Sequence, residues 1–271
     1  MYKLPQELTD KIIGSIDRAN PSGHSALLAC SRVGRSWRRQ AQKELFFRVS
    51  FLSVDHLEGW DRNISPESEI PSFVRQLLWG ALPTRIEASE GLDPFLENTF
   101  PGRFAPFSNI EDLHISGLSL PSLENAMIER TFSPIGHSLR SLQIDNLTAD
   151  PEKWCFLISF LPSLRHLSIF SATMLERERG PGLDDPPSFN FTGHITTYNH
   201  RAEQFFRHVA SLRPCFTSLG VFEISDSLVE TLNLVLKSCS NTLTALSIFP
   251  LSRRTPRNTK SAQCARGSVF C

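Results

Sequence analysis

Two histidines and two aspartates are the residues best placed to do chemistry. His114 and His166 occupy matching positions in two copies of a short recurring pattern, and Asp112 and Asp145 lie in the same kind of segment. Together they could form a metal or acid/base site, although such a row more often makes the polar surface of a repeat protein. The sequence contains no GxSxG, HExxH, GxxxxGK or GxGxxG motif. We therefore expect no enzymatic activity, no metal and no cofactor.

The recurring pattern is apolar-x-x-apolar-x-apolar. Its starts lie 36, 29, 25, 55 and 24 residues apart, close to one or two units of a repeat of about 20 to 29 residues. This half of the chain resembles divergent leucine-rich repeats. Its six copies run from Val74 to Trp79, Ile110 to Ile115, Leu139 to Ile144, Leu164 to Ile169, Leu219 to Ile224 and Leu243 to Ile248.

The segments between the copies have the periodicity of helices. Residues 151–161, 201–212 and 226–236 each repeat apolar side chains at spacings of three and four, which places them on one side of a helix. Helices that alternate with strands through short links favour a parallel sheet backed by helices. The predicted fold class is α/β, with N-terminal helices followed by an open α/β solenoid.

Strand alternation predicts which side chains leave the core. The apolar positions of each copy point inward, so the residues beside the central apolar position point out onto one face of the sheet. Phe170 and Phe249 are the expected anchors for a protein ligand on this face, and its acidic side chains would steer a basic partner. The predicted ligand-binding residues are Asp112, His114, Gln143, Asp145, His166, Phe170, Glu223 and Phe249, on a face that also includes Gln76, Leu78 and Val221.

Two segments depart from the repeat. Residues 176–199 are charged and then rich in Gly and Pro, and they fill the place of a missing copy, with a strand expected within 189–197. This loop is the other candidate for binding the ligand, since long loops are often functional. Residues 252–271 are basic and patternless, so we expect a disordered tail that leaves the last strand without a polar capping unit.

The first fifty residues form a different unit. Leu8, Ile12, Ile13 and Ile16 predict one helical face, and residues 20–23 break the chain. A second short helix is expected around residues 26–30, and a third after Ser36, which could cap it. Three helices in so short a stretch bury little surface, which indicates that part of their apolar side needs a partner.

This unit resembles the F-box, in the divergent form common in mushroom-forming fungi. The resemblance is carried in order by Leu4-Pro5-x-Glu7-Leu8, Ile12-Ile13, residues 27–37 and Leu45-Phe46, while Arg32 and Gly34 depart from it. It implies that the unit binds a Skp-type adaptor and that the repeats recruit a protein for ubiquitination by a cullin-RING ligase. A non-ligase interaction scaffold is the alternative. The implied adaptor-binding residues are Leu4, Pro5, Leu8, Ile12, Ile13, Leu28, Val33, Trp37 and Leu45.

Composition and charge limit the classes of partner that this chain is expected to bind. Residues 1–50 carry a net charge of +5, residues 51–251 of −10 and residues 252–271 of +5. An acidic middle argues against nucleic acid, and no stretch approaches the 18 or so apolar residues of a membrane span. The six scattered cysteines favour a reducing compartment, so we expect a cytoplasmic or nuclear protein. The expected organisation is an F-box at 1–50, a helix and linker at 51–72, repeats at 73–251 and the tail at 252–271.

Overall fold

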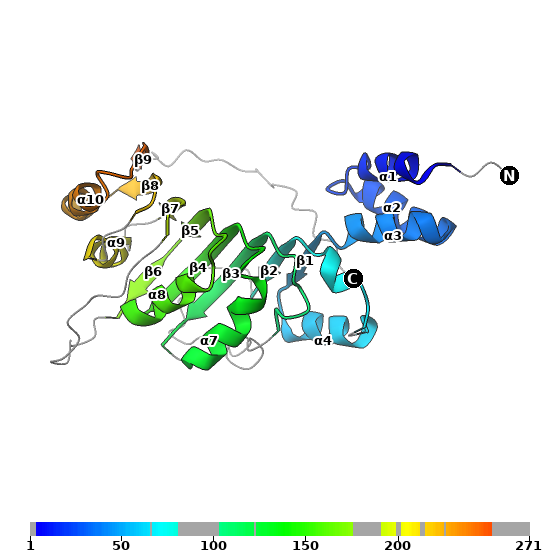
Figure 1. Ribbon diagram of the computed structural model, residues 1–271, viewed down its shortest axis with the longest axis horizontal. Coiled ribbons are helices and arrows are strands. Elements are labelled where there is room, and N and C mark those ends of the chain that lie inside the picture. The colour runs from blue at the N-terminus through cyan, green and yellow to red at the C-terminus, as the bar shows by residue number, and fades with distance from the viewer. Residues whose placement is uncertain are drawn as a thin grey trace, which may run out of the picture.

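The computed structural model describes residues 4–65, 67–80, 103–121, 123–175, 191–198, 202–211, 215–224 and 226–250. N-terminal helices are followed by an open, all-parallel sheet that alternates with helices, as in leucine-rich repeats (Figure 1). The predicted α/β class is therefore confirmed. The predicted disordered tail, and residues 176–190 of the predicted loop, lie outside the described residues.

The N-terminal helices, α1 (Gln6–Gly14), α2 (Pro21–Val33) and α3 (Arg35–Leu45), form what we call the helical module. Pro5 precedes the first residue of α1, and the Asn20 side chain caps α2 by accepting a hydrogen bond from the backbone N–H of Ser22. The prediction for Ser36 is wrong: α3 begins at Arg35, and no side chain caps it. The chain is extended at Gly34, between α2 and α3, so the two helices meet without a loop.

The module has a very small core of its own. Ile13, Leu27 and Ala41 are fully buried, one from each helix, so the core joins all three. Around them pack the partly buried side chains of Ile16, Cys30, Trp37 and Leu45.

The sheet begins immediately after the module. Strand β1 (Arg48–Phe51) follows α3 and pairs in parallel with β2 (Gln76–Trp79), with helices α4 (Val54–Asn63) and α5 (Ile70–Phe73) between them. Strand β1 was not predicted, and it starts inside residues 1–50, the stretch assigned to the N-terminal unit. The ring of Trp60 on α4 lies edge-on to Phe51 of β1, with ring centroids 5.5 Å apart. It also contacts Phe46, at 6.0 Å, and so ties the end of the module to the first strand.

The remaining strands extend one sheet. Its order is β1-β2-β3-β4-β5-β7-β8-β9, and all of these strands are parallel. Strand β6 lies off this path and pairs with β4. Sequence order and spatial order agree along this path, as expected for a solenoid in which each unit packs on the one before. The later strands are β3 (Asp112–Ser119), β4 (Ser141–Ala149), β5 (His166–Ile169), β6 (Ala172–Met174), β7 (His194–Tyr198), β8 (Ser218–Ile224) and β9 (Ala245–Pro250).

The pairing register adds one copy of the repeat and corrects another. Leu167 aligns with Ile195, Ile195 with Leu219, and Leu219 with Leu246. Strand β7 is therefore the copy expected between β5 and β8. The sequence pattern places the fifth copy three residues too late. In the structure this copy runs from Phe216 to Val221, and its central apolar residue is Leu219. All three of its apolar side chains are fully buried.

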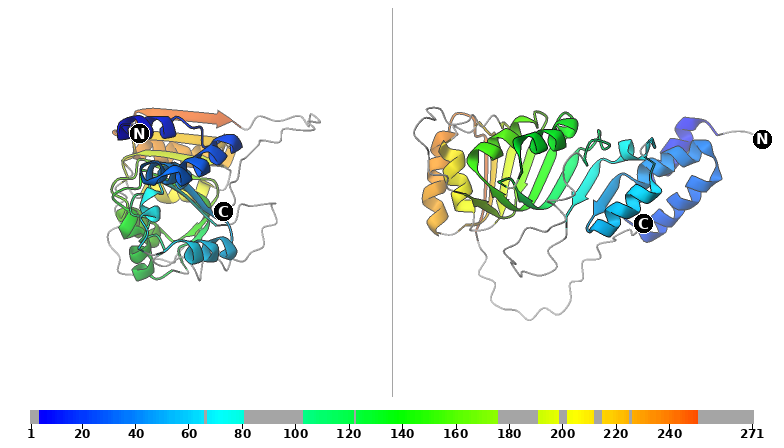
Figure 2. Two further views of the ribbon diagram at one scale, coloured as in Figure 1. Left: turned by 90° about the vertical axis from the view of Figure 1, so that its right-hand side faces the viewer. Right: turned by 90° about the horizontal axis from the view of Figure 1, so that it is seen from below.

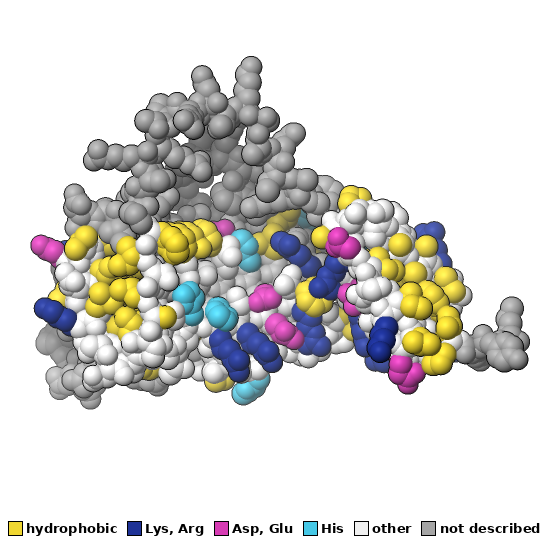
Figure 3. Space-filling model, turned by 90° about the horizontal axis from the view of Figure 1, so that it is seen from above, with side chains coloured by type: hydrophobic (Ala, Val, Ile, Leu, Met, Phe, Trp, Pro, Cys, Tyr) yellow, Lys and Arg dark blue, Asp and Glu magenta, His cyan; other side chains and the backbone are white. Residues whose placement is uncertain are grey.

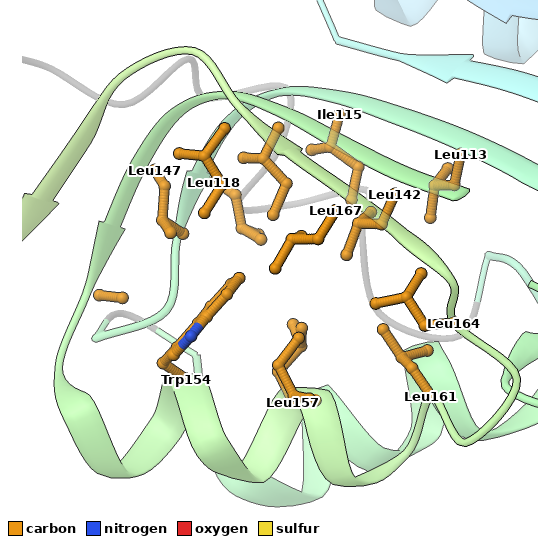
Figure 4. Close-up of a cluster of buried hydrophobic side chains, with 14 of the residues drawn as sticks. Leu113, Ile115, Leu118, Leu142, Leu147, Trp154, Leu157, Leu161, Leu164 and Leu167 are labelled. Atoms are coloured by element: carbon orange, nitrogen blue, oxygen red, sulfur yellow. The ribbon is translucent and has the colours of Figure 1, made fainter. Parts of the chain in front are cut away.

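Helices cover one side of the sheet (Figure 1). On the sequence-predicted side of the helix at Pro151–Ser159, Trp154 and Leu157 pack under strand residues, and Leu161, just beyond its end, packs with them (Figure 4). The strand residues are Leu118, Leu142, Leu147 and Leu167. The molecule is elongated, with the helical module at one end and the last repeat at the other (Figure 2). The helices are α7 (Asn125–Phe132), the 3-10 helix η1 (Ser133–Ile135), α8 (Pro151–Ser159), α9 (Ala202–Ser211) and α10 (Asp226–Ser238).

Candidate functional site

The side of the sheet opposite the helices, which we call the open face, brings together side chains from successive repeats. Because parallel strands are in register, residues at equivalent positions form rows that run across the strands. One row contains Asp112, Ser141, His166, His194 and Ser218, and the next contains His114, Gln143, Ser168 and Thr196. Four of the sequence-predicted residues of this face, Asp112, His114, Gln143 and His166, therefore do come together.

The acidic part of the open face is tied into hydrogen bonds. His114 Nε2 lies 2.7 Å from Asp145 Oδ2, and both side chains are largely buried, at 25% and 16% exposed. Gln143 Nε2 lies 3.1 Å from the same histidine nitrogen. One strand nearer the module, Gln76 Nε2 donates a hydrogen bond to Asp112 at 3.0 Å. These contacts hold both carboxylates in fixed orientations on β3 and β4.

A second polar cluster surrounds His194. Its Nδ1 lies 2.7 Å from Ser218 Oγ, and its Nε2 lies 2.7 Å from Thr196 Oγ1. The His166 ring is its neighbour across the strands, with centroids 6.1 Å apart. Burial first, and then the nearby His166, lower the pKa of His194 below its ordinary value. This environment favours the neutral imidazole.

Four aromatic rings form a continuous stack, which we call the aromatic ladder, along the third row of the open face. Phe170 stacks on Tyr198 with centroids 4.2 Å apart, Tyr198 on Phe222 at 4.3 Å, and Phe222 on Phe249 at 4.2 Å. The first three rings are half-buried and Phe249 is 47% exposed. Since the rings cover one another's faces, the ladder presents its edges as a narrow apolar ridge.

The corrected register changes the predicted face at β8. Val221 was expected to point outward, but it is fully buried, because Gly220 and Phe222 hold the outward positions of this copy. Glu223 lies in β8, but its side chain is not among the described residues. Leu78, also expected on the open face, is only 7% exposed.

Sequence reasoning missed His194, Tyr198 and Phe222. The strand expected within 189–197 is present as β7, but it was not recognised as a copy of the repeat. Phe191 lies four residues before Ile195, one more than the pattern allows, and Thr197 replaces the last apolar residue of the copy. Phe222 was assigned to the core by the shifted register. A row continued from Phe170 to Phe249 across an unbroken sheet would have placed Tyr198 and Phe222 between them.

Two histidines of the open face, His114 and His194, each contact two hydrogen-bonding side chains. His114 contacts a carboxylate and, as its other neighbour, Gln143. His194 contacts a serine and, as its other neighbour, Thr196. Within the described ranges, no three His, Cys, Asp or Glu residues are grouped so that they could hold a metal ion. A rigid row of donors and acceptors beside an apolar ridge is typical of a surface that binds a protein segment.

The helical module carries the other set of predicted residues, and they divide into two groups. Ile13 is fully buried, and Trp37 and Leu45 pack on the module's core, so these three hold the helices together. Pro5 is exposed at the start of α1. The large apolar side chains left exposed on the module are Leu4, Leu8, Ile12, Leu28 and Val33.

Exposed large apolar side chains gather at the two ends of the described structure. Besides the five on the helical module, five more lie on α10 and β9, and Val54 and Leu175 are the remaining ones. Seen from above, hydrophobic side chains gather at both ends, with histidines and acidic side chains between them (Figure 3). Apolar patches of this kind mark surfaces that contact partners. The five at the C-terminal end are Val229, Leu234, Leu246, Ile248 and Phe249.

No protein-family model matches this chain, and no curated protein matches it. Its class is therefore defined by its fold, a parallel α/β repeat sheet that follows a small helical module. Over the described residues, every helix is too short or too polar to cross a membrane.

Proposed function

We propose that this chain is the substrate receptor of an SCF-type ubiquitin ligase. In this proposal the helical module is an F-box that docks on a Skp-type adaptor, and the repeats hold the protein to be ubiquitinated. The chemistry would occur on other subunits. This chain would contribute proximity, by keeping a substrate lysine close to the enzyme that carries activated ubiquitin.

One observation carries the proposal: residues of the F-box-like motif are exposed on a module too small to need them for its own core. Leu8 and Ile12 are 47% and 46% exposed on α1, while the neighbouring Ile13 is fully buried. A helix whose apolar residues divide in this way has one side for folding and another available for a partner. Leu4, Leu28 and Val33 add to the second set.

The open face supports the second half of the proposal. It is not covered by the helices, and it combines fixed carboxylates at Asp112 and Asp145 with the aromatic ladder. Aromatic anchors beside oriented charges are common at the centres of protein interfaces. A segment with basic and apolar side chains has the complementary chemistry.

The test is a binding measurement between the full chain and a purified Skp-type adaptor. Leu8→Ala combined with Ile12→Ala removes two exposed contacts, and we expect a loss of about 2 kcal/mol, or roughly thirtyfold in Kd. Val54→Ala is the matched control, since Val54 is 43% exposed on α4, outside the module. Circular dichroism must show that the double variant is folded. Equal affinity of the double variant and the control would refute docking through this surface.

Copurification separates a ligase subunit from a scaffold. Recovery of both the adaptor and a cullin with the wild-type chain, and loss of both with the double variant, supports the ligase. Recovery of the adaptor without a cullin supports the alternative, a scaffold that uses the same docking surface for another purpose.

A further inference from the structure

Strand β9 forms one of the two edges of the sheet, and it is the more exposed of the two edge strands. It pairs with β8 on one side, and no strand of the described residues pairs with its other side. Residues 245–249 are all exposed, with Leu246 at 42% and Ile248 at 45%, whereas their partners Leu219 and Val221 in β8 are fully buried. At the opposite edge of the sheet, Phe51 of β1 is only 2% exposed.

The backbone of β9 faces this edge in a defined pattern. The N–H of Ala245 donates to the carbonyl of Thr217, at 3.2 Å, which directs Ala245 toward β8. In a parallel pair, alternate residues direct their backbone groups to opposite sides. Leu246 and Ile248 therefore present their N–H and C=O groups to the open side. An edge of this kind is a template for pairing with another strand.

The same two residues make the edge complementary to itself. If two copies of β9 run antiparallel about Ser247, Leu246 lies opposite Ile248 of the second copy, and Ile248 opposite Leu246. Both pairs then have their hydrogen-bonding groups directed at each other. Both also place apolar side chains on the helix-covered side of the sheet, continuing the layer formed by Leu219 and Val221.

Other registers are poorer. Centring the pair on Ile248 would place Leu246 opposite Pro250, which has no backbone N–H to donate. Centring it on Leu246 would place Ile248 opposite Thr244 and break the apolar pairing. In the register centred on Ser247, by contrast, both apolar pairs form, and every residue in these pairs has a backbone N–H that can donate a hydrogen bond.

We propose that a second copy of this chain covers the β9 edge, forming a two-fold symmetric dimer by antiparallel β9–β9 pairing centred on Ser247. A two-fold contact uses the same surface on both copies, which this edge provides. Val229 and Leu234 on α10 add exposed apolar side chains at the same end of the molecule. The helical modules lie at the far ends, so the dimer presents two of them.

A cysteine at the symmetry axis tests both the dimer and its register. In the proposed register Ser247 faces its own copy as a non-hydrogen-bonded pair, with Cα atoms about 4.5 Å apart, inside the range of about 4.4 to 6.8 Å for disulfides. Ser247→Cys should give a covalent dimer on mild oxidation, joined through residue 247 when mapped by mass spectrometry. Thr244→Cys is the matched control, because its two copies would lie roughly 20 Å apart.

A second variant tests the edge without cross-linking. Sedimentation of the wild-type chain at micromolar concentration should show a dimer, and Ile248→Lys should weaken it by about 100-fold, because a lysine would place a charge in the apolar pair. Val54→Lys, at a similarly exposed site on α4, should leave the dimer intact.

Three results would overturn the proposal. The first is a wild-type chain that sediments as a monomer over this range. The second is a dimer that survives Ile248→Lys, which would place the interface elsewhere. The third is a Ser247→Cys variant whose introduced thiol oxidises to Cys264 or Cys271 of its own chain, which would make the tail the occupant of the edge.

Discussion

At the scale of single residues, His194 is the titratable group of the open face that contacts a hydroxyl at each ring nitrogen. Its two ring nitrogens contact Ser218 and Thr196, and the His166 ring is the nearest titratable neighbour. Burial, followed by the field of His166, lowers its pKa. The folded state therefore holds this imidazole neutral at a pH where the unfolded chain would protonate it.

The first prediction follows from the sign of that shift. Because the pKa of His194 is lower in the folded state, its contribution to stability is fully present above the ordinary value of 6.5 and is lost as the pH falls below it. The free energy of unfolding, measured with urea, should fall more between pH 7 and pH 5 for the wild-type chain than for His194→Gln. His137→Gln, at an exposed site, controls for the loss of an imidazole. Parallel pH profiles for wild type and His194→Gln would contradict the assignment.

Strand alternation predicts single residues well where the pattern is regular. Asp112, His114, Gln143 and Asp145 all lie on β3 or β4, and their side chains make the hydrogen bonds of the open face, as alternation requires. Alternation failed at Val221, because the segment from Phe216 to Ile224 satisfies the repeat pattern in two registers. Pairing with the neighbouring strands decides between them, and a shift by an odd number of residues exchanges the two faces.

At the scale of elements, helix α8 shows how each repeat is stabilised. Trp154 and Leu157 lie along one side of the helix, Leu161 follows just beyond its end, and all three meet the strands from below (Figure 4). Trp154 is fully buried, and its ring lies edge-on to Phe205 of α9, with centroids 5.9 Å apart. This side chain therefore joins two helices and the sheet.

The second prediction concerns the volume of that side chain. Trp154→Ala leaves a large cavity and should lower the free energy of unfolding by about 3 to 5 kcal/mol. Trp154→Phe should cost much less, because it keeps most of the volume and the indole Nε1 has no hydrogen-bond partner to lose among the described residues. Urea denaturation of both variants measures the difference. An alanine variant as stable as the phenylalanine variant would show that packing at this site is not limiting.

Elements were predictable where their periodicity was complete. Helices α8, α9 and α10 were expected from apolar residues spaced by three and four, and their described apolar residues on those sides are buried. Strand β1 was missed because it has only four residues and follows α3 so closely that Phe46 and Phe47 look like part of a helical face. Its place in the sheet depends on pairing with β2, a contact that local pattern does not contain.

At the scale of the whole molecule, the surfaces available to partners are separated by the length of the solenoid. The helical module lies beyond β1 and the open edge belongs to β9, at opposite ends of the strand order. The open face, with its carboxylates and aromatic ladder, lies between them. Because the docking surface of the module shares no residues with the open face, variants in one should leave binding through the other intact.

The third prediction uses that separation to test the open face. Phe170→Ala removes one end of the aromatic ladder, and Asp145→Asn removes the carboxylate that contacts His114. If the face binds a basic and apolar segment, the affinity of the double variant for the bound protein should fall by roughly 30- to 1,000-fold, because each of the two contacts contributes about 1 to 2 kcal/mol. Binding to the Skp-type adaptor should not change.

Quantitative proximity labelling with the wild-type chain, the double variant and a control measures this. Ser159→Ala is a suitable control, since Ser159 is exposed at the end of α8. Proteins labelled by wild type and control but depleted in the double variant would be ligands of the open face. If the labelled set is unchanged while the variant remains folded, the open face is not the receptor surface. The part of the segment 176–199 that precedes β7 then becomes the next one to replace, because it is a long insertion in the repeat pattern.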